Sequence, residues 1–234
     1  MSPTVNAPAP LSRRERPAKP ALTRERIIDA ALAILEEDGL GKVTMRRIAA
    51  ALDTGPASLY VYVRNTEDLH GQILDALLGR MAPVPDHGSW RDRLHALLTG
   101  YGQVLFDHPE IARMTMRSYP VGPHYFALGE NILELLGEGG VPDERAAWAL
   151  DLLLASVTAT AVEHGAEEAT SEGTQALSIL AAAIAVTPRE TYPRIARLGD
   201  ELLTGTGIER FTWSLDVLIN GILATPRTSN FSRL

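Results

Sequence analysis

The most restrictive feature of this sequence is a nearly continuous succession of helical segments that begins at Thr23. Apolar residues recur at helical spacing in this region, as Ile27, Ala31, Ile34 and Leu35 do in the first segment. The patterns that predict β-sheets are almost absent, because neither alternating runs nor Asn-Gly or Asp-Gly turns between β-branched stretches occur. We therefore predict an all-α fold.

Helix boundaries follow from capping residues and from breaks in the apolar pattern. Thr23, Thr44 and Asn65 can cap helices, Gly39 can end one, and Pro56 can begin one. The predicted helices cover residues 24–38, 45–52, 56–62, 67–80, 90–106, 109–116, 123–137, 143–166, 172–186, 189–203 and 207–224.

The best candidate for a domain boundary is the segment 81–89, whose prolines and glycine break the helical pattern. We expect a disordered basic arm over residues 1–22, a three-helix helix-turn-helix domain over 23–80 and a larger helical domain over 81–234. The arm holds five prolines in its first 20 residues. The alternative for the arm is a solvated tail without a role.

The net charge of −7 is unevenly distributed along the chain. Residues 1–80 hold 11 basic and 10 acidic residues, whereas residues 81–234 hold 11 basic and 19 acidic ones. The N-terminal part can therefore still present a local basic surface to nucleic acid.

Several classes of site are disfavoured by composition. The chain has no cysteine, and its six histidines show no close metal-ligand spacing, so we expect no metal and no cofactor. Neither a secretory signal nor an apolar run of about 18 residues is evident, which predicts a cytoplasmic protein without a membrane partner.

The second and third predicted helices have outward faces that suit DNA. On a helical wheel, Arg46 and Arg47 point away from the apolar side of the second helix. In the third helix, Ala57, Ser58 and Val61 cluster opposite the buried edge, where a solvated helix would show lysine and glutamate. Small side chains of this kind allow a helix to enter the major groove of DNA.

Each of these side chains has a contact that it could make with a duplex. Ser58 can hydrogen-bond a base edge or a phosphate, and Ala57 and Val61 can contact thymine methyl groups. Tyr60 and Tyr62 flank this face, with hydroxyls placed for backbone phosphates. The alternative is a helical hairpin in which both tyrosines are half-buried packing residues.

Residues 23–80 resemble the DNA-binding domain of the TetR family of transcriptional regulators. The resemblance rests on Gly39, Thr44, Arg46, Leu59-Tyr60, Val63, Arg64 and Asn65. It implies DNA contacts at Thr44, Arg46, Pro56, Ala57, Ser58, Tyr60, Val61 and Tyr62. Thr66 stands where the family usually has lysine, so the phosphate contact there must come from the backbone or be lost. Asp53 replaces the usual glycine, which aspartate can do because it accepts left-handed backbone.

Residues 211–223 are similar to the last helix of the tetracycline-repressor branch of that family. In that branch the eighth and last helices form a four-helix dimer interface, and here these are 143–166 and 207–224. The resemblance implies a homodimer, and the alternative is that the same stripe is ordinary core of one chain. The residues that would form the interface are Ala155, Ala159, Gly221, Trp148, Leu152, Trp213 and Val217.

The C-terminal domain is expected to bind a small, largely apolar molecule. The candidate lining residues are Tyr101, Met114, Met116, Tyr125, Phe126, Trp148 and His164. Each of them could instead be plain core. In alignment with the tetracycline repressors, Ala82 and Thr115 take the two histidine positions, which speaks against a magnesium–tetracycline ligand.

These features predict a ligand-responsive repressor that binds a palindromic operator in double-stranded DNA as a dimer and is released by a small-molecule inducer. The alternative is a DNA-binding regulator without a small ligand, controlled by a protein partner. The catalytic motifs G-x-S-x-G and H-E-x-x-H, the P-loop and G-x-G-x-x-G are missing from the sequence, so we assign no catalytic residue.

Overall fold

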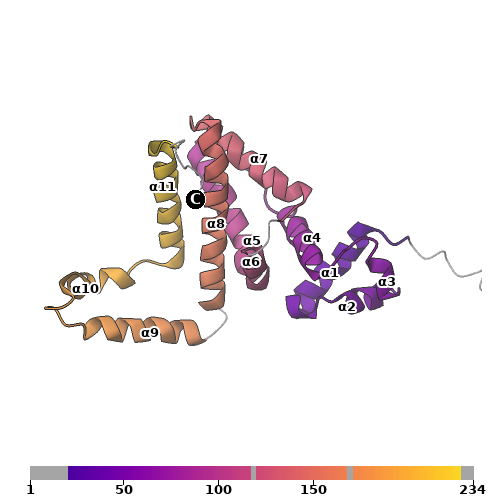
Figure 1. The fold of residues 1–234 in the computed structure, drawn as a ribbon, viewed down its shortest axis with the longest axis horizontal. Helices are drawn as coiled ribbons and strands as arrows, with labels where there is room; N and C mark the ends of the chain where they lie inside the picture. The colour runs from indigo at the N-terminus through magenta and orange to yellow at the C-terminus, as the bar shows by residue number, and fades with distance from the viewer. Residues whose placement is uncertain (1–20, 117–119, 168–170, 228–234) are drawn as a thin grey trace, which may run out of the picture.

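The structure is a computed structural model that describes residues 21–116, 120–167 and 171–227. Within these ranges the side chains of residues 164–167, 171–174, 176 and 177 are not described. The described residues form helices and connecting turns only, which confirms the all-α prediction (Figure 1). The predicted basic arm lies outside the described residues, except for Ala21 and Leu22.

The N-terminal domain is a small bundle that carries the predicted helix-turn-helix. Its elements are α1 (Arg24–Asp38), the 3₁₀ turn η1 (Leu40–Lys42), α2 (Met45–Ala51), α3 (Pro56–Leu59) and α4 (Thr66–Leu78). The predicted caps are confirmed. The side-chain oxygens of Thr23, Thr44 and Asn65 accept backbone N–H groups three residues further on, at 3.3, 3.2 and 2.8 Å.

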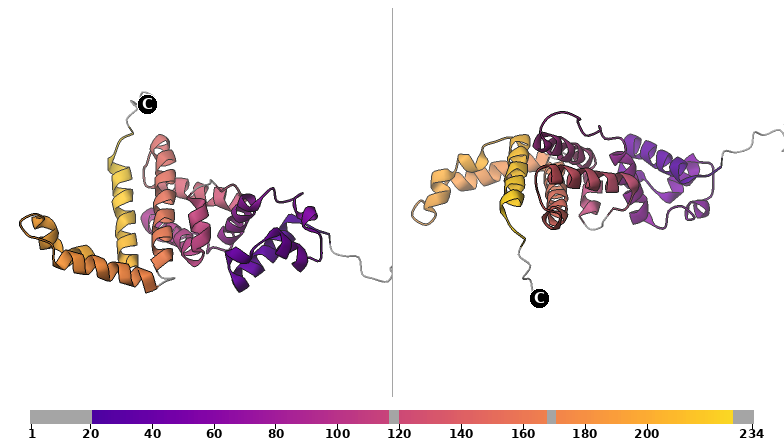
Figure 2. Two further views of the ribbon diagram at one scale, coloured as in Figure 1. Left: turned by 60° about the horizontal axis from the view of Figure 1, so that its bottom comes forward. Right: turned by 90° about the horizontal axis from the view of Figure 1, so that it is seen from above.

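The C-terminal domain is larger and is built around one long helix. Its elements are α5 (Trp90–Asp107), α6 (Pro109–Thr115), α7 (Pro123–Glu138), α8 (Asp143–Glu167), α9 (Ser171–Ala185), α10 (Pro193–Leu198), η2 (Glu201–Leu203) and α11 (Gly207–Ala224). The long helix α8 packs against α5, α6, α7 and α11. In Figure 2, α11 runs beside α8 in the opposite direction.

Two predicted helices are shorter in the structure. The α-helix α3 ends at Leu59, and the chain continues in turns to Val63, whose N–H bonds the carbonyl of Leu59 at 3.0 Å. The predicted helix 189–203 is replaced by the short helix α10 and the turn η2. The physical reason is that Pro193 can occupy only the first turn of a helix, so a helix must start there rather than pass through it.

The core is continuous from one domain to the other. In the N-terminal domain Ile27, Ile48 and Leu59 are fully buried, and in the C-terminal domain Leu98 and Val157 are. All five belong to one cluster of buried apolar residues. Because α4 contributes to this cluster and packs against α1, α6 and most extensively α7, it connects the two domains mechanically.

One described helix, α8 between Asp143 and Glu163, has the length and hydropathy of a membrane-spanning segment. Part of this helix packs inside the chain, where Leu153 and Val157 are fully buried, whereas Trp148 and Leu152 are exposed. The charged side chain of Asp151 lies near its middle.

A projection made of α9 and α10 extends from the end of α8, at the opposite end of the molecule from the N-terminal domain (Figures 1 and 2). Large apolar side chains on it are exposed, among them Ile179 at 63%, Leu180 at 51% and Val186 at 81%. Helices of water-soluble proteins seldom leave so many apolar residues in water, which indicates that something other than the described part of this chain covers the projection.

The chain just before α1 is fixed to the helix-turn-helix by one side chain. The half-buried Tyr62 donates its hydroxyl hydrogen to the carbonyl oxygen of Leu22 at 2.7 Å. Tyr62→Phe should therefore lower the free energy of unfolding by about 0.5–1.5 kcal/mol, measured by urea denaturation. Tyr60→Phe is the matched control, because Tyr60 is 55% exposed. Equal stability of both variants would show that the hydrogen bond contributes nothing.

Candidate DNA interface and ligand cavity

The segment from Pro56 to Val63 presents a narrow outer surface. Leu59 and Val63 are fully buried in the apolar core, and α3 packs against α2. Ala57, Ser58 and Val61 are exposed, as the helical wheel predicts, and Val61 is 80% exposed. A valine so accessible is more costly in water than a polar residue, so this face is suited to contact with an apolar group such as a thymine methyl.

The turn before this segment has the backbone that the sequence predicts. Asp53 adopts φ = 49°, in the left-handed region, and it is the one non-glycine residue with positive φ among those described. The N–H of Thr54 closes the turn on the carbonyl of Ala49 at 2.9 Å. This turn sets the angle between α2 and α3, and hence the direction in which α3 is presented.

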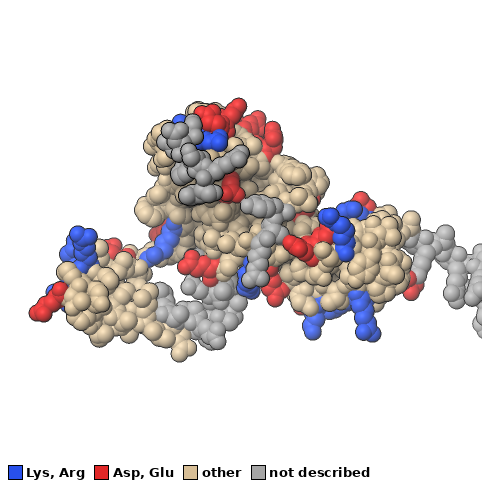
Figure 3. All heavy atoms as spheres, in the orientation of Figure 1, with Lys and Arg blue, Asp and Glu red and all other residues tan. Residues whose placement is uncertain are grey.

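The two arginines of α2 have different roles. Arg47 forms an ion pair with Asp38 at the end of α1. Arg46 is exposed and forms no ion pair with any described residue. Basic side chains project from the lower side of the N-terminal domain in Figure 3. Arg46 is therefore the arginine of this pair that is available to an external phosphate or guanine.

The remaining predicted contacts are also accessible, with one exception. Thr44, Pro56, Tyr60 and Thr66 are exposed, and the Tyr60 side chain is 55% exposed. Tyr62 does not fit the predicted phosphate contact, because its single hydroxyl hydrogen is given to Leu22 inside the domain. The geometry of Tyr62 agrees with the alternative, in which it is a half-buried packing residue of the domain.

A cavity of about 790 Å³ lies between α5, α6, α7 and α8. Four of the predicted ligand residues line it: Tyr101, Met116, Tyr125 and Phe126. The other lining residues are Thr115, Pro120, Gly129, Glu130, Leu133, Ala147, Leu150, Asp151, Leu154, Ala155 and Thr158. The volume is that of a drug-sized ligand site.

Three of the predicted ligand residues, Met114, Trp148 and His164, are not among the described residues that line this cavity. Met114 is half-buried and packs against the core instead. Trp148 is 52% exposed and lies under the guanidinium of Arg227, 4.2 Å from its ring centre. The residues of α8 that line the cavity are Ala147, Leu150, Asp151, Leu154, Ala155 and Thr158, and Trp148 is not among them. The side chain of His164 lies outside the described residues.

The deep wall of the cavity is polar and internally bonded. The fully buried Tyr101 places its hydroxyl 2.9 Å from that of Thr158, which in turn donates to the carbonyl of Leu154 at 2.8 Å. Burial raises the pKa of the Tyr101 phenol, so the group stays neutral. The sequence analysis missed Thr158 and Asp151, although their spacing on α8 with Leu154 marks one helical face.

The N-terminal domain is joined to this cavity through a buried carboxylate. Asp75 on α4 is only 9% exposed, and it accepts the backbone N–H of Tyr125 at 2.9 Å. Its second oxygen lies 3.0 Å from Nδ1 of His124. Both partners belong to the first turn of α7, and Tyr125 lines the cavity. One end of the cavity wall is therefore bonded directly to α4.

Two glycines make this α4–α7 junction possible. A Cβ atom at Gly122 would overlap the Asp75 carboxylate, and a Cβ atom at Gly79 would lie 2.7 Å from the ring of His124. The two helices approach so closely only because these positions carry no side chain. No sequence signal marked Asp75, since its partners lie about fifty residues away in the chain.

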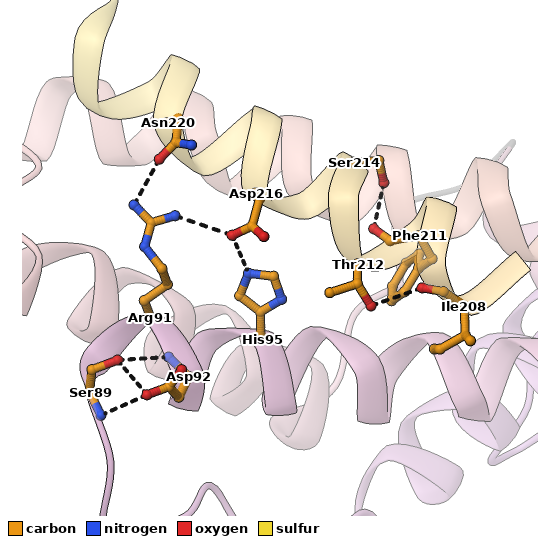
Figure 4. A network of polar contacts seen from close by, with 10 residues as sticks. All are labelled: Ser89, Arg91, Asp92, His95, Ile208, Phe211, Thr212, Ser214, Asp216 and Asn220. Atoms are coloured by element: carbon orange, nitrogen blue, oxygen red, sulfur yellow. Dashed lines mark hydrogen bonds and ion pairs between the residues drawn. The ribbon is translucent and has the colours of Figure 1, made fainter. Parts of the chain in front are cut away.

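A second polar network attaches α11 to α5 (Figure 4). Arg91 donates to Asn220 at 2.9 Å, and His95 lies 3.2 Å from the carboxylate of Asp216, which Arg91 also approaches at 3.5 Å. On α8, Arg145 donates to the last carbonyls of α11 at 3.0 and 2.8 Å. These contacts fix α11 beside α8.

Among the described residues, no group of three or more histidine, aspartate or glutamate side chains is placed to hold a metal ion. Thr115, at one of the two aligned histidine positions, donates its hydroxyl hydrogen to the carbonyl of Ile111 at 2.9 Å. The described part of the cavity therefore contains no cluster of the kind that would chelate magnesium through histidine.

Known proteins share this architecture. Residues 27–73 match the family described as "Bacterial regulatory proteins, tetR family", and residues 82–225 match "Tetracyclin repressor-like, C-terminal domain". An HTH-type transcriptional regulator of Saccharopolyspora erythraea is 33% identical over 156 residues. That alignment covers 64% of this chain and spans 66% of the length of the curated relative.

Two solved structures from Streptomyces cover most of the chain. The transcription regulator SCO7704 is 44% identical, with a TM-score of 0.74, over 90% of this chain and 99% of its own. ActR of Streptomyces coelicolor, solved in complex with actinorhodin, is 31% identical, with a TM-score of 0.78, over 88% and 97% of the two chains. The chain belongs to the TetR family of transcriptional regulators, which are not enzymes, and it carries a C-terminal domain of the tetracycline-repressor type.

Proposed function

We propose that this protein is a repressor that binds a palindromic operator as a homodimer and leaves it when a small, largely apolar molecule occupies the cavity. The observation that carries the proposal is the junction at Asp75, which bonds the cavity wall to the helix that supports the DNA-binding surface. The likeness to ActR, which was solved with a small molecule, supports the same assignment. Such a protein acts in the cytoplasm, where its DNA lies.

The proposed DNA contacts form one continuous outer surface. Ala57, Ser58 and Val61 enter the major groove, and Pro56 begins the helix that carries them. Their exposure and the burial of Leu59 beneath them support this orientation.

Phosphate contacts surround that surface. Thr44, Arg46 and Tyr60 are exposed beside it, and Thr66 offers the free backbone N–H of the first turn of α4 to a further phosphate. Tyr62 acts differently in this proposal, because it holds the segment before α1 in place.

The proposed dimer pairs α8 and α11 with the same helices of a second copy. The exposed faces of these two helices carry large apolar side chains, with Trp148 and Leu152 on α8 at 52% and 46% exposure and Trp213 and Val217 on α11 at 69% and 47%. Exposed apolar side chains on two neighbouring helices are typical of an isologous interface. The apolar projection of α9 and α10 would lie along the second copy.

The proposed mechanism has two states. A ligand in the cavity displaces the first turn of α7, and Asp75 transfers that displacement to α4 and to the DNA-binding surface. In a dimer, a small rotation of each α4 changes the spacing of the two surfaces, which then no longer match successive half-sites. A change from 1:99 to 99:1 between the states requires the ligand to prefer the released state by about 5.5 kcal/mol.

The first prediction concerns DNA contacts. Tyr60→Phe removes a hydroxyl that donates to a phosphate of the DNA. It should weaken the binding of all duplexes by a similar free energy, on the order of 1 kcal/mol. The measurement is fluorescence anisotropy with an operator selected from random duplexes and with unrelated duplexes. Tyr192→Phe, an equally exposed tyrosine outside this surface, is the control. A changed order of preference among sequences would show that Tyr60 reads bases.

The second prediction concerns the dimer. Replacing Trp213 and Val217 together by serine should convert the dimer to a monomer in analytical ultracentrifugation, because it removes apolar area from the interface. Val121→Ser, at 64% exposure outside α8 and α11, is the control and should leave the dimer intact. A double variant that sediments as the wild type does would place the interface elsewhere.

The third prediction concerns the α4–α7 junction. Asp75→Ala should abolish the effect of a cavity ligand on operator affinity, and should also cost about 1–3 kcal/mol of stability. Asp75→Asn keeps an oxygen for the Tyr125 N–H and should retain much of the response. The measurement is operator Kd with and without a saturating compound from a thermal-shift screen. An unchanged Kd ratio in Asp75→Ala would exclude this route.

A further inference from the structure

Three of the six histidines lie where the C-terminal domain meets the DNA-binding domain. His70 belongs to α4, His108 is the residue just before α6, and His124 belongs to the first turn of α7. Both α6 and α7 pack against α4. The charge of an acidic residue from the opposite domain acts on each of these histidines. The boundary between the domains is therefore rich in groups that titrate near neutral pH.

His70 and His108 are half-buried on the α6 side of this boundary. The charge of Glu110 on α6 acts on His70. The charge of Glu36 on α1 acts on His108, which also has Asp107 directly before it at the end of α5. These two histidines thus connect α6 with the two helices, α4 and α1, that support the DNA-binding surface.

The surroundings of these two rings favour their neutral forms. Burial lowers the pKa of His70 and of His108, and the acidic neighbours raise the pKa by less. One of those neighbours, Glu36, is bonded at 2.7 Å to Arg80, which follows α4, so part of its charge is already balanced. A proton on either ring would therefore place a poorly hydrated cation between the packed helices.

The α7 side of the boundary responds to acid in the opposite sense. Nδ1 of His124 lies 3.0 Å from the carboxylate of Asp75, which is only 9% exposed. A proton on His124 turns this contact into an ion pair, and the ring keeps much of its hydration because its side chain is 51% exposed. Acid therefore strengthens the contact between α7 and α4, whereas it weakens the contact between α6 and α4.

We propose that the α6 side of the domain boundary opens with the uptake of protons by His70 and His108, while the α7 side stays closed. Above about pH 6.5, the ordinary pKa of histidine, the closed boundary keeps its full stability. As the pH falls below that value, open forms bind protons that the closed form does not, and their population grows. The pH thus regulates how firmly the two domains are held together. This inference goes beyond the proposed function, since neither operator nor ligand takes part in it.

The test is hydrogen exchange of the full-length protein without DNA, followed by mass spectrometry at pH 7.5 and pH 5.5. Division by the rates of unstructured peptides of the same sequence removes the effect of pH on the exchange chemistry. One pH unit below its ordinary pKa, each histidine can change the opening equilibrium by at most about tenfold. We expect the protection of the α6 amides to fall by between about threefold and about a hundredfold. The first turn of α7, where the Tyr125 N–H is bonded to Asp75, should keep its protection.

Variants connect the effect to the named histidines. His70→Gln combined with His108→Gln removes both titrating rings and should give α6 the same protection at the two pH values. His87→Gln is the matched control, because the His87 side chain is 88% exposed in the segment between the domains, and it should leave the loss of protection unchanged. An NMR titration of the wild-type ring Cε1–H signals, assigned with the single variants, is a second measurement that does not need the double variant. The signals of His70 and His108 should titrate at lower pH than that of His87.

Several results would overturn the inference. These are equal protection of α6 at the two pH values, a loss of protection that persists in the double variant, or titration of His70 and His108 at the same pH as His87. An equal loss of protection in the first turn of α7 would also overturn it, because that result indicates general unfolding. A protein that binds no operator would refute the proposed function and would leave these measurements unaffected.

Discussion

The structure depends on one buried carboxylate where its two domains meet. Asp75 is bonded to the first turn of α7 and lies on α4, whose other face holds the helix-turn-helix in place. A charge in this position is stable only while its hydrogen bonds are kept, because an unsatisfied buried carboxylate is costly. The junction therefore resists gradual deformation. When α7 moves, α4 must either follow it or lose these bonds.

This constraint explains how the rest of the molecule is arranged around the cavity. The wall that α7 forms ends at the junction, and the opposite wall belongs to α8, whose outer face carries the apolar side chains of the proposed dimer interface. Contacts from Arg91 and Arg145 hold α11 beside α8. The cavity thus lies between α8, which is proposed to be fixed by dimerisation, and α7, which is bonded to the DNA-binding domain. A ligand that pushes α7 away from α8 would therefore move α7.

The sequence predicts local features well and distant contacts poorly. The caps at Thr23 and Thr44 and the left-handed Asp53 depend on neighbouring residues, and the structure has all of them as predicted. The hydrogen bond of Tyr62 was not predicted, because its partner, Leu22, lies forty residues earlier in the chain. Trp148 was assigned to the cavity from its chemistry alone, and it is 52% exposed and absent from the cavity lining. The sequence analysis did not single out Glu130 and Asp151, which line the cavity with exposed side chains.

The central claim, that occupation of the cavity moves the DNA-binding domains through Asp75, can be measured as a distance. The chain has no cysteine, so a spin label at Glu37→Cys on α1 would be the single label in each protomer. Pulsed electron paramagnetic resonance then gives the separation of the two labels in the dimer. The account predicts that a saturating cavity ligand shifts this distance in the otherwise unchanged protein and leaves it unshifted when Asp75→Ala is added. The same distance with the cavity empty and full, or an undiminished shift in the Asp75→Ala variant, would contradict it.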